Sequence, residues 1–345
     1  MRIFTVAVSS LAVASAACAA PVVIGHRGAA GERPEHTLES YRVAIAAGAD
    51  FIEPDLVVTK DGVLVARHEN EIGETTDVAT HPEFAARRTA KTIDGTRVSG
   101  WFTEDFMLAE LKTLRARERL PKLRPANTAW DGQFDVPTFA EILVLARASS
   151  RGGRTVGVYA ETKHPSYFAA IGLPLERRLI DQLDGAGFRE RGDAAVIQSF
   201  EVGNLKVLRQ MTKLRLVQLI DAGSPADDPA TSYDAMVTPA GLRAIATYAD
   251  GIGPAKARII PRDAAGRSLL PTSLVADAHA AGLVVHPWTF RAENLFLPTE
   301  LRHGTDPAGH GDVITEITMF LAAGVDGVFA DTPGAAIAAR VKAAR

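Results

Sequence analysis

Short apolar runs recur along the whole chain, and most of them precede a stretch of helical periodicity. Eight runs have the length and composition of buried strands, at residues 22–25, 50–58, 155–163, 194–200, 214–220, 251–254, 283–290 and 324–331. Between them, segments such as TLESYRVAIAAGA and PLERRLIDQLDGAGF repeat apolar residues every three to four positions and contain Gly near their ends, as helices commonly do. This alternation predicts parallel strands joined by crossover helices.

The number of strand and helix units favours one closed barrel over an open sheet. Eight such units make up a (β/α)8 TIM barrel, so the predicted fold class is α/β with that architecture. Residues 69–133 break the alternation, because they are rich in Arg, Thr and Asp, have little strand character and contain one helical piece near 109–117. We interpret them as a small insertion between the second and third strand units. No repeat or low-complexity linker is visible, so we predict a single barrel domain over residues 20–345.

The first nineteen residues are typical of a secretory signal peptide. Arg2 is followed by an apolar run over 3–14 and by Ala17-Cys18-Ala19, a small-residue cleavage site. The run is shorter than the ~20 apolar residues that span a bilayer, so we expect removal of residues 1–19 and a periplasmic or secreted protein. Cys18 is the only cysteine, so cleavage leaves no thiol for disulfides, zinc or nucleophilic catalysis. A lipid-modified Cys18 is the alternative.

Composition and charge narrow the class of partner. The chain is 47% hydrophobic and 23% charged, as soluble globular proteins are. Its net charge of -3 shows no excess of Lys and Arg, which argues against nucleic acid and against a polybasic membrane anchor. We therefore expect a small-molecule partner and no stable membrane insertion.

Polar residues interrupt the apolar runs near their C-terminal ends, where the active sites of α/β barrels lie. Glu53 and Asp55 are two positions apart in the second run, so both side chains point to one face of the strand. Two such carboxylates repel each other unless a cation lies between them, and Glu161 in the third run supplies a third oxygen ligand. Three carboxylates suit a hard cation, Ca²⁺ or Mg²⁺. An ion-pair network with Arg27 and Lys163 would explain the same residues without a metal.

Two histidines flank this acidic pair in the sequence. His26 ends the first run, and His68 follows the short run VLVAR. Imidazole exists in both protonation states near neutral pH, so one histidine can take a proton from an attacking hydroxyl while the other gives one to a leaving alkoxide. The alternative is that each is a structural or surface histidine.

Two cationic residues and an aromatic residue fall near the same strand ends. Arg27, with its planar guanidinium, and Lys163, with a compact charge, would complement a phosphate group. Each could equally neutralise the carboxylates. Trp288 could form an apolar wall for a glycerol backbone or a leaving group, or it could serve packing alone.

Taken together, these segments resemble the glycerophosphodiester phosphodiesterase family. The match is specific in residues 26–69, which contain His-Arg-Gly, then Pro-Glu-His-Thr, the acidic pair in Glu-Pro-Asp, Thr-Lys-Asp-Gly and a final His. The later pieces follow in the order of the family and extend the match over nearly the whole chain after residue 19: ETKHP (161–165), QSF (198–200), PWT (287–289) and GVDGVFADTP (324–333). The insertion is similar to that of the longer periplasmic members.

The resemblance implies a (β/α)8 barrel with a small inserted domain and a complete set of site residues. His26 and His68 would be the general acid and base. One divalent cation, with Ca²⁺ preferred over Mg²⁺, would be bound by Glu53, Asp55 and Glu161. The phosphate would contact Arg27 and Lys163, and the substrate cleft would be lined by Phe200 and Trp288. The implied reaction converts a glycerophosphodiester into glycerol 3-phosphate and an alcohol, through attack of the substrate's own hydroxyl and a cyclic phosphate.

One residue departs from the family pattern, and two other functions stay open. His36 stands where the family more often has Asn, which leaves the hydrogen bonding around the metal site undetermined. A related barrel phospholipase, D-like or C-like, would act on a membrane lipid, although no amphipathic segment suited to an interface is visible. A catalytically silent exported phosphodiester-binding protein would have the same barrel, although neither histidine and no acidic ligand is lost.

Overall fold

A computed structural model describes residues 20–345, and the predicted signal peptide with Cys18 lies outside this range. The strands are β1 (Val22–His26), β2 (Phe51–Glu53), β3 (Asp55–Val58), β4 (Leu64–Ala66), β5 (Thr89–Ile93), β6 (Thr96–Gly100), β7 (Gly157–Thr162), β8 (Ala195–Ser199), β9 (Arg215–Ile220), β10 (Gly251–Pro254), β11 (Val284–Val285) and β12 (Gly327–Ala330). The α-helices are α1 (Leu38–Ala47), α2 (Leu108–Leu111), α3 (Phe139–Ser149), α4 (Pro165–Ala170), α5 (Glu176–Gly185), α6 (Val202–Met211), α7 (Tyr233–Met236), α8 (Pro239–Ile245), α9 (Leu274–Ala280), α10 (Val313–Ala322) and α11 (Pro333–Ala343).

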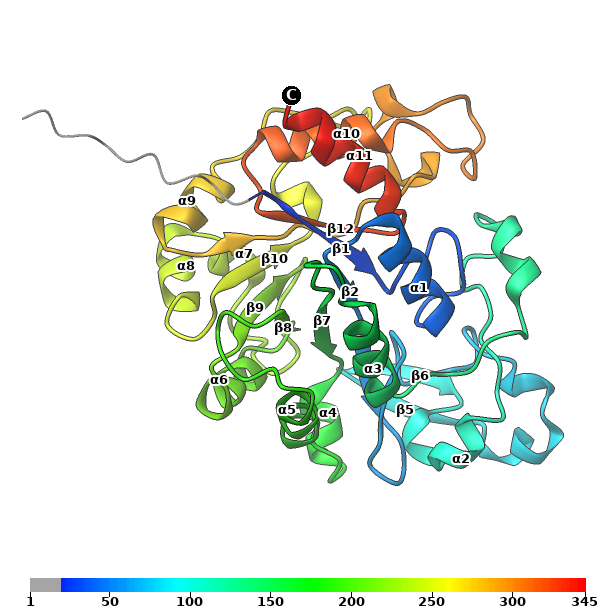
Figure 1. Cartoon of the computed structure of the whole chain (residues 1–345). Coiled ribbons are helices and arrows are strands. Elements are labelled where there is room, and N and C mark those ends of the chain that lie inside the picture. Colours follow the sequence, from blue (N-terminus) through cyan, green and yellow to red (C-terminus); the bar gives the residue numbers. More distant parts are fainter. Residues whose placement is uncertain (1–19) are drawn as a thin grey trace, which may run out of the picture.

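The main sheet closes into the predicted barrel. Its strands are neighbours in the order β11-β10-β9-β8-β7-β2-β1-β12, and all of these pairs are parallel. The segment that follows β11 closes the barrel against β12, because Phe290 N donates to Phe329 O at 2.8 Å and Phe329 N donates to Pro287 O at 3.1 Å. The longer helices surround the strands (Figure 1). The TIM-barrel prediction is confirmed.

The helices begin and end where local sequence chemistry predicts. At the start of α1, the Thr37 hydroxyl accepts from Ser40 N, which satisfies one of the free N–H groups of the first turn. The helix ends at Gly48, which has φ of 102° and so adopts a left-handed conformation that favours glycine. Within residues 20–345, no helix combines the length and the apolar composition that crossing a bilayer requires.

Three local features differ from the sequence prediction. The single strand expected over 50–58 is divided into β2 and β3 at Pro54, because proline has no N–H to donate to a neighbouring strand. The insertion, expected to have little strand character, contains the hairpin β5–β6, whose turn Asp94-Gly95 has positive φ at both residues. The helix expected near 109–117 is limited to the four residues of α2.

The barrel interior is built in layers because side chains alternate along each strand. An apolar cluster fills the barrel interior on the N-terminal side of the site residues, which is called the lower interior here. It consists of Ile24, Phe51, Tyr159, Val196, Val217 and Phe329. Two residues further along the same strands, on the same face, lie His26, Glu53, Glu161, Gln198, Leu219 and Asp331. The apolar layer therefore closes the barrel beneath a layer of mainly polar side chains at the C-terminal ends of the strands, and it excludes water from that side.

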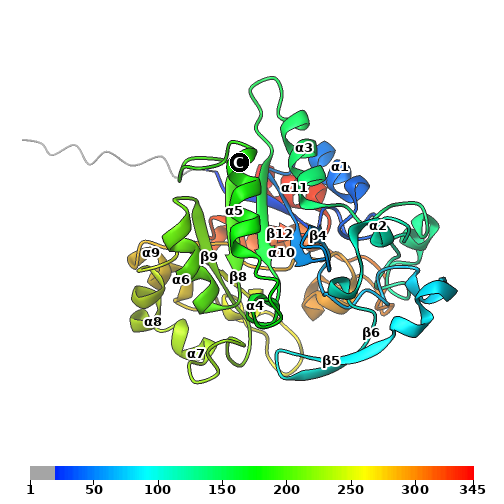
Figure 2. The ribbon, with the colours of Figure 1, turned by 90° about the horizontal axis from the view of Figure 1, so that it is seen from below.

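The inserted segment is fastened to the barrel by a buried arginine. Arg124 is 5% exposed, and its guanidinium donates to Ala30 O at 2.8 Å, to Glu293 Oε1 at 2.5 Å and to Asp331 Oδ2 at 2.5 Å. Both carboxylates are buried. Glu293 depends on this cation for compensation of its charge, whereas Asp331 also pairs with Arg291 Nε at 3.1 Å. The β5–β6 hairpin of the same segment runs along the edge of the molecule (Figure 2).

Replacement of Arg124 by Leu should lower the free energy of unfolding by about 3–5 kcal/mol, because in a dry environment Glu293 would lose the cation with which it pairs and Asp331 would keep only Arg291. Urea unfolding followed by circular dichroism measures this difference. Arg97→Leu is the control, since Arg97 is exposed on β6 and should change stability by less than about 0.5 kcal/mol. Equal midpoints for the two variants would contradict the structural role of Arg124.

Candidate active site

The predicted site residues meet at one cavity at the C-terminal end of the barrel. A cavity of about 70 Å³ is lined by eight of the nine residues proposed from the sequence: His26, Arg27, Glu53, His68, Glu161, Lys163, Phe200 and Trp288. The ninth, Asp55, pairs in register with Glu161 of the neighbouring strand. Residues separated by more than 250 positions in the chain are therefore brought to one point.

Three of these residues form a buried acidic cluster. Glu53, Asp55 and Glu161 each place one carboxylate oxygen within 4.8 Å of the others, and each residue is at most 5% exposed. Glu53 accepts from the backbone N–H of Arg27 at 2.6 Å and from Gln198 Nε2 at 3.1 Å. These bonds hold the Glu53 carboxylate in place from the end of β1 and from β8.

The electrostatics of the cluster favour a bound cation. Burial and the nearby charges of Asp55 and Glu161 raise the pKa of Glu53 well above its usual range, and burial raises the pKa of Glu161 to about 8. Burial also opposes ionisation of Asp55, but His36, Lys163 and Arg27 outweigh it and hold its pKa well below the usual range. Asp55 Oδ1 is buried without a hydrogen-bond partner. A divalent cation fits this arrangement, because it would replace the protons and satisfy the unpaired oxygen.

His26 is oriented by a carboxylate that the sequence analysis did not assign. Asp331, just after β12, lies 2.6 Å from His26 Nδ1, which leaves Nε2 facing the cavity 3.5 Å from Thr289 Oγ1. Burial and the charge of Arg27 lower the pKa of His26 to about 4, although Asp331 opposes this shift. Without substrate, His26 is therefore neutral at pH 7, with Nδ1 donating to Asp331 and Nε2 free to accept a proton.

His68 has a similar carboxylate behind it, within a longer network. Its Nδ1 lies 2.9 Å from Glu69 Oε1, and Glu69 Oε2 lies 2.8 Å from His164 Nε2. His164 Nδ1 in turn lies 2.6 Å from Asp94 Oδ2, in the turn of the β5–β6 hairpin. Burial lowers the pKa of His164, but Asp94 and Glu69 outweigh it and raise that pKa to about 9. The insertion thus contacts the barrel through a cationic histidine behind His68.

Arg27 and Lys163 place positive charge beside the acidic cluster. Arg27 has φ of 55° and directs its guanidinium to Glu35 Oε2 at 2.9 Å and Asp55 Oδ2 at 3.4 Å. Lys163 Nζ donates to Glu161 Oε1 at 2.9 Å. Both contribute to the neutralisation expected from the sequence, and both also line the cavity where an anion would enter.

Aromatic side chains form one wall of the cavity. Phe200, which follows β8, packs edge to face on Trp288 with ring centroids 5.7 Å apart. Trp288 Nε1 donates to Gly253 O at 2.7 Å, which fixes the plane of the indole ring. Both predicted lining residues therefore reach the cavity, with Leu219 completing the apolar part of the wall.

His36, the departure from the family pattern, is a buried neighbour of the acidic cluster. It is 0% exposed, its Nε2 lies 3.0 Å from Asp55 Oδ2, and its Nδ1 lies 2.9 Å from Tyr41 Oη. Because burial lowers its pKa, a neutral ring that donates to Asp55 Oδ2 and accepts from Tyr41 satisfies both ring nitrogens and the Tyr41 hydroxyl. His36 is thus placed to orient Asp55. His286, in contrast, lies in the barrel interior with Nδ1 2.9 Å from Tyr159 Oη.

The sequence analysis did not assign roles to Asp331, Glu69 or Asp94. Asp331 was visible as the polar residue that ends the last predicted strand, and barrel closure would place it beside the first strand. Glu69 directly follows His68, and Asp94 precedes a glycine in a hairpin-type turn. Each of these three positions is recognisable in the sequence, but none of them reveals by itself which histidine the carboxylate pairs with.

Comparison with known proteins gives the family. A model of the glycerophosphoryl diester phosphodiesterase family matches residues 26–335. A glycerophosphodiester phosphodiesterase of Arabidopsis thaliana is 37% identical over 328 residues, which are 91% of this chain and 84% of that protein.

Two solved structures share the fold. The crystal structure of a protein from Silicibacter pomeroyi aligns with a TM-score of 0.67 at 22% identity, over 93% of this chain and 94% of that one. An Oleispira antarctica phosphodiesterase in complex with the product sn-glycerol-3-phosphate aligns with a TM-score of 0.58 at 19% identity, over 92% and 96%. Together with the family match, these findings confirm the resemblance seen in the sequence: the chain belongs to the glycerophosphoryl diester phosphodiesterase family.

Proposed function

We propose that the protein hydrolyses glycerophosphodiesters to glycerol 3-phosphate and an alcohol, with a divalent cation and with His26 and His68 as the acid–base pair. The observation that carries this proposal is the meeting of three buried carboxylates and two carboxylate-backed histidines in one cavity of a family member. The Oleispira antarctica phosphodiesterase, which holds sn-glycerol-3-phosphate, supports a small-molecule substrate of this kind.

The proposed substrate orientation follows from charge and polarity. The phosphodiester anion lies against Arg27 and Lys163, where a planar guanidinium and an ammonium complement its oxygens. The glycerol end lies in the cavity that the two histidines line, against Trp288 and Leu219, with its 2-hydroxyl near the acidic cluster. The leaving alcohol then points out of the barrel.

The proposed first step is an attack within the substrate. One histidine accepts the 2-hydroxyl proton at Nε2, and the glycerol oxygen bonds to phosphorus as the bond between phosphorus and the alcohol oxygen breaks. The second histidine, which is protonated at Nε2 in the proposed substrate complex, donates that proton to the departing oxygen, which gives the free alcohol and a five-membered cyclic phosphate. A cation held by Glu53, Asp55 and Glu161 would acidify the hydroxyl and offset charge on the phosphoryl oxygens.

The proposed second step opens the ring with water. The histidine that gave its proton now accepts one from water, and the other returns its proton to the 2-oxygen as that bond to phosphorus breaks. The product is glycerol 3-phosphate, and both histidines regain their starting states. The carboxylates of Asp331 and Glu69 stabilise whichever imidazole is protonated and keep its Nε2 directed at the cavity.

Ca²⁺ is the cation that we expect, in preference to Mg²⁺. All donors are carboxylate oxygens, which both ions accept, but Ca²⁺ tolerates irregular geometry at about 2.3–2.6 Å whereas Mg²⁺ requires near-octahedral geometry at about 2.0–2.1 Å. Strand ends fixed by backbone pairing cannot readily contract around the smaller ion.

We also propose that the enzyme acts outside the cytoplasm after removal of residues 1–19. N-terminal sequencing of the protein recovered from the periplasm or medium would test this proposal.

Activity on glycerophosphocholine should require both histidines. We expect His26→Ala and His68→Ala each to lower kcat by about 10²–10⁴-fold, since each removes one proton-transfer group. The assay measures glycerol 3-phosphate released by the Ca²⁺-loaded protein. His303→Ala, at an exposed histidine, is the control and should retain full activity. If the protein consumed intact phosphatidylcholine but no soluble diester, the lipid-directed alternative would replace this proposal, and binding without turnover would indicate a silent binding protein.

Cation affinity should rise with pH. The pKa of Glu161 is raised to about 8 by burial and that of Glu53 is also raised, so below pH 8 the cation competes with protons and must displace them. Isothermal titration of chelator-treated protein with Ca²⁺ at pH 6, 7 and 8, in buffers of different ionisation enthalpy, measures both the affinity and the protons released. Glu161→Gln should weaken binding, whereas Glu83→Gln, at an exposed site, should not. Affinity that is independent of pH would contradict the displacement of protons.

Asp94→Asn should lower kcat by about tenfold, although Asp94 lies outside the barrel. Loss of this carboxylate lowers the pKa of His164 and weakens its hold on Glu69, so His68 becomes less well oriented. The chemical shifts of His164 across a pH titration report the first effect, and steady-state kinetics report the second. Arg97→Gln on the same hairpin is the control. If the pKa of His164 shifts while kcat stays unchanged, Asp94 does not contribute to catalysis.

A further inference from the structure

A second cavity adjoins the proposed catalytic cavity. It has a volume of about 310 Å³, within the ~300–1,000 Å³ range of ligand pockets. The two cavities share Glu161, Lys163 and Phe200 as lining residues. A diester whose phosphate lies against Lys163 therefore has its glycerol end in one cavity and its alcohol end in the other.

The wall of this second cavity carries uncompensated negative charge. Lys163 is paired with Glu161, and His164 is paired with Asp94 and Glu69. Among residues 20–345, neither the Glu201 nor the Asp221 carboxylate forms an ion pair, although Arg258 Nε donates to the backbone oxygen of Asp221 at 3.0 Å. Glu201 is buried and accepts only from Ser166, through its backbone N–H and its hydroxyl. Burial, together with Asp227 and Asp94, raises the pKa of Glu201 to about 7, so Glu201 is about half ionised at neutral pH and a bound cation would favour its charged form.

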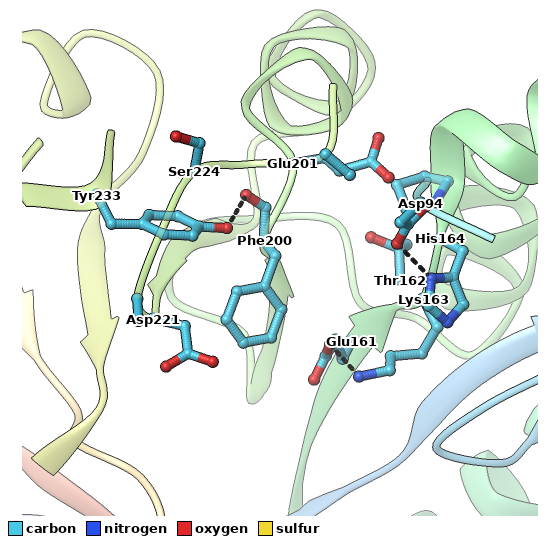
Figure 3. Close-up of a pocket in the computed structure, with 13 residues that line it drawn as sticks. Asp94, Glu161, Thr162, Lys163, His164, Phe200, Glu201, Asp221, Ser224 and Tyr233 are labelled. Atoms are coloured by element: carbon cyan, nitrogen blue, oxygen red, sulfur yellow. Dashed lines mark hydrogen bonds and ion pairs between the residues drawn. The ribbon is translucent and has the colours of Figure 1, made fainter. Parts of the chain in front are cut away.

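Aromatic rings supply the rest of the wall. Phe200 lies between Tyr233 and Asp221 on one side and Lys163 with Glu161 on the other (Figure 3). Phe200 and Tyr233 pack edge to face with ring centroids 6.4 Å apart, and Tyr233 Oη donates to Phe200 O at 3.3 Å. Lys163 Nζ lies 5.7 Å from the centroid of the Phe200 ring, so one cation already approaches this ring. Aromatic rings next to carboxylates attract an alkylammonium group through cation–π and ionic interactions together. They offer much less to a neutral polyol.

We propose that this cavity is a subsite for a cationic alcohol, so that the enzyme prefers diesters of choline or ethanolamine over diesters of glycerol or inositol. This inference rests on the proposed phosphodiesterase function and specifies its substrate class. The ammonium group lies against Glu201 and Asp221, and its carbon substituents contact Phe200 and Tyr233. The phosphate stays beside Arg27 and Lys163, so the two charges of a zwitterionic diester meet walls of opposite charge.

The test compares diesters that differ only in the alcohol, because all of them release glycerol 3-phosphate in one assay. We expect kcat/KM for glycerophosphocholine and glycerophosphoethanolamine to exceed that for glycerophosphoglycerol by about tenfold, mainly through KM. Asp221→Asn and Glu201→Gln should each lower this ratio several-fold, and Asp221→Lys should bring it to one or below. Lysophosphatidylcholine, in a parallel arm, shows whether the same ammonium group is also accepted on an acylated glycerol.

Asp228→Asn is the matched control, because Asp228 carries the same charge in the same loop as Asp221 but does not line the cavity. Its ratio should equal that of the unaltered enzyme. Equal kcat/KM for the choline and glycerol diesters, with ratios unaffected by Asp221→Asn and Asp221→Lys, would overturn the subsite while leaving the phosphodiesterase function intact.

If no diester is turned over, that result counts against the proposed function and leaves the subsite to be tested by binding. Isothermal titration of Ca²⁺-loaded His26→Ala protein with glycerophosphocholine and glycerophosphoglycerol compares the two alcohols without chemistry. Tighter binding of the choline diester, weakened by Asp221→Asn, supports the subsite. Equal dissociation constants for the two diesters would overturn it.

Discussion

Three carboxylates buried at one point impose the constraint to which the surrounding structure responds. Burial raises the free energy of each charge, and mutual repulsion raises it further, so Glu53 and Glu161 both favour the protonated state. This cost is offset by ion pairs with Arg27 and Lys163 and by hydrogen bonds from the neutral donors His36 and Gln198. These groups come from several strands and loops, so only a rigid barrel can hold them all within hydrogen-bonding distance.

The same constraint explains the layered interior. A low dielectric environment strengthens the attraction of the cluster for a cation, and the apolar layer below it prevents water from screening that attraction. Because side chains alternate along a strand, six of the eight barrel strands supply one residue to the apolar layer and, two positions later, one residue to the layer that contains Glu53 and Glu161. The two layers are therefore consequences of one two-residue period.

This period is also why much of the fold and site could be predicted from sequence. Glu53 and Asp55 reveal their shared face locally, and polar residues at the ends of apolar runs indicate the mouth of a barrel. What could not be predicted depends on contacts between distant segments. His26 and Asp331 are 305 positions apart, and their pairing requires closure of the last strand on the first. Asp94 required a hairpin that its polar surroundings concealed, although Asp-Gly is a strong turn signal.

The two ends of the proposed substrate depend on different parts of the molecule. Residues at the ends of the barrel strands, or directly after them, surround the phosphate and glycerol end, where the barrel fixes their positions. The alcohol end meets loops: Glu201 and Asp221 follow β8 and β9, and Asp94 belongs to the inserted hairpin. Loops tolerate substitution better than barrel strands, so alcohol preference can change while the phosphoryl chemistry stays fixed. Asp94 limits this freedom, because it lines the outer cavity and also supports His164 behind His68. A change in the insertion that alters the choice of alcohol therefore also alters the orientation of a proposed catalytic histidine.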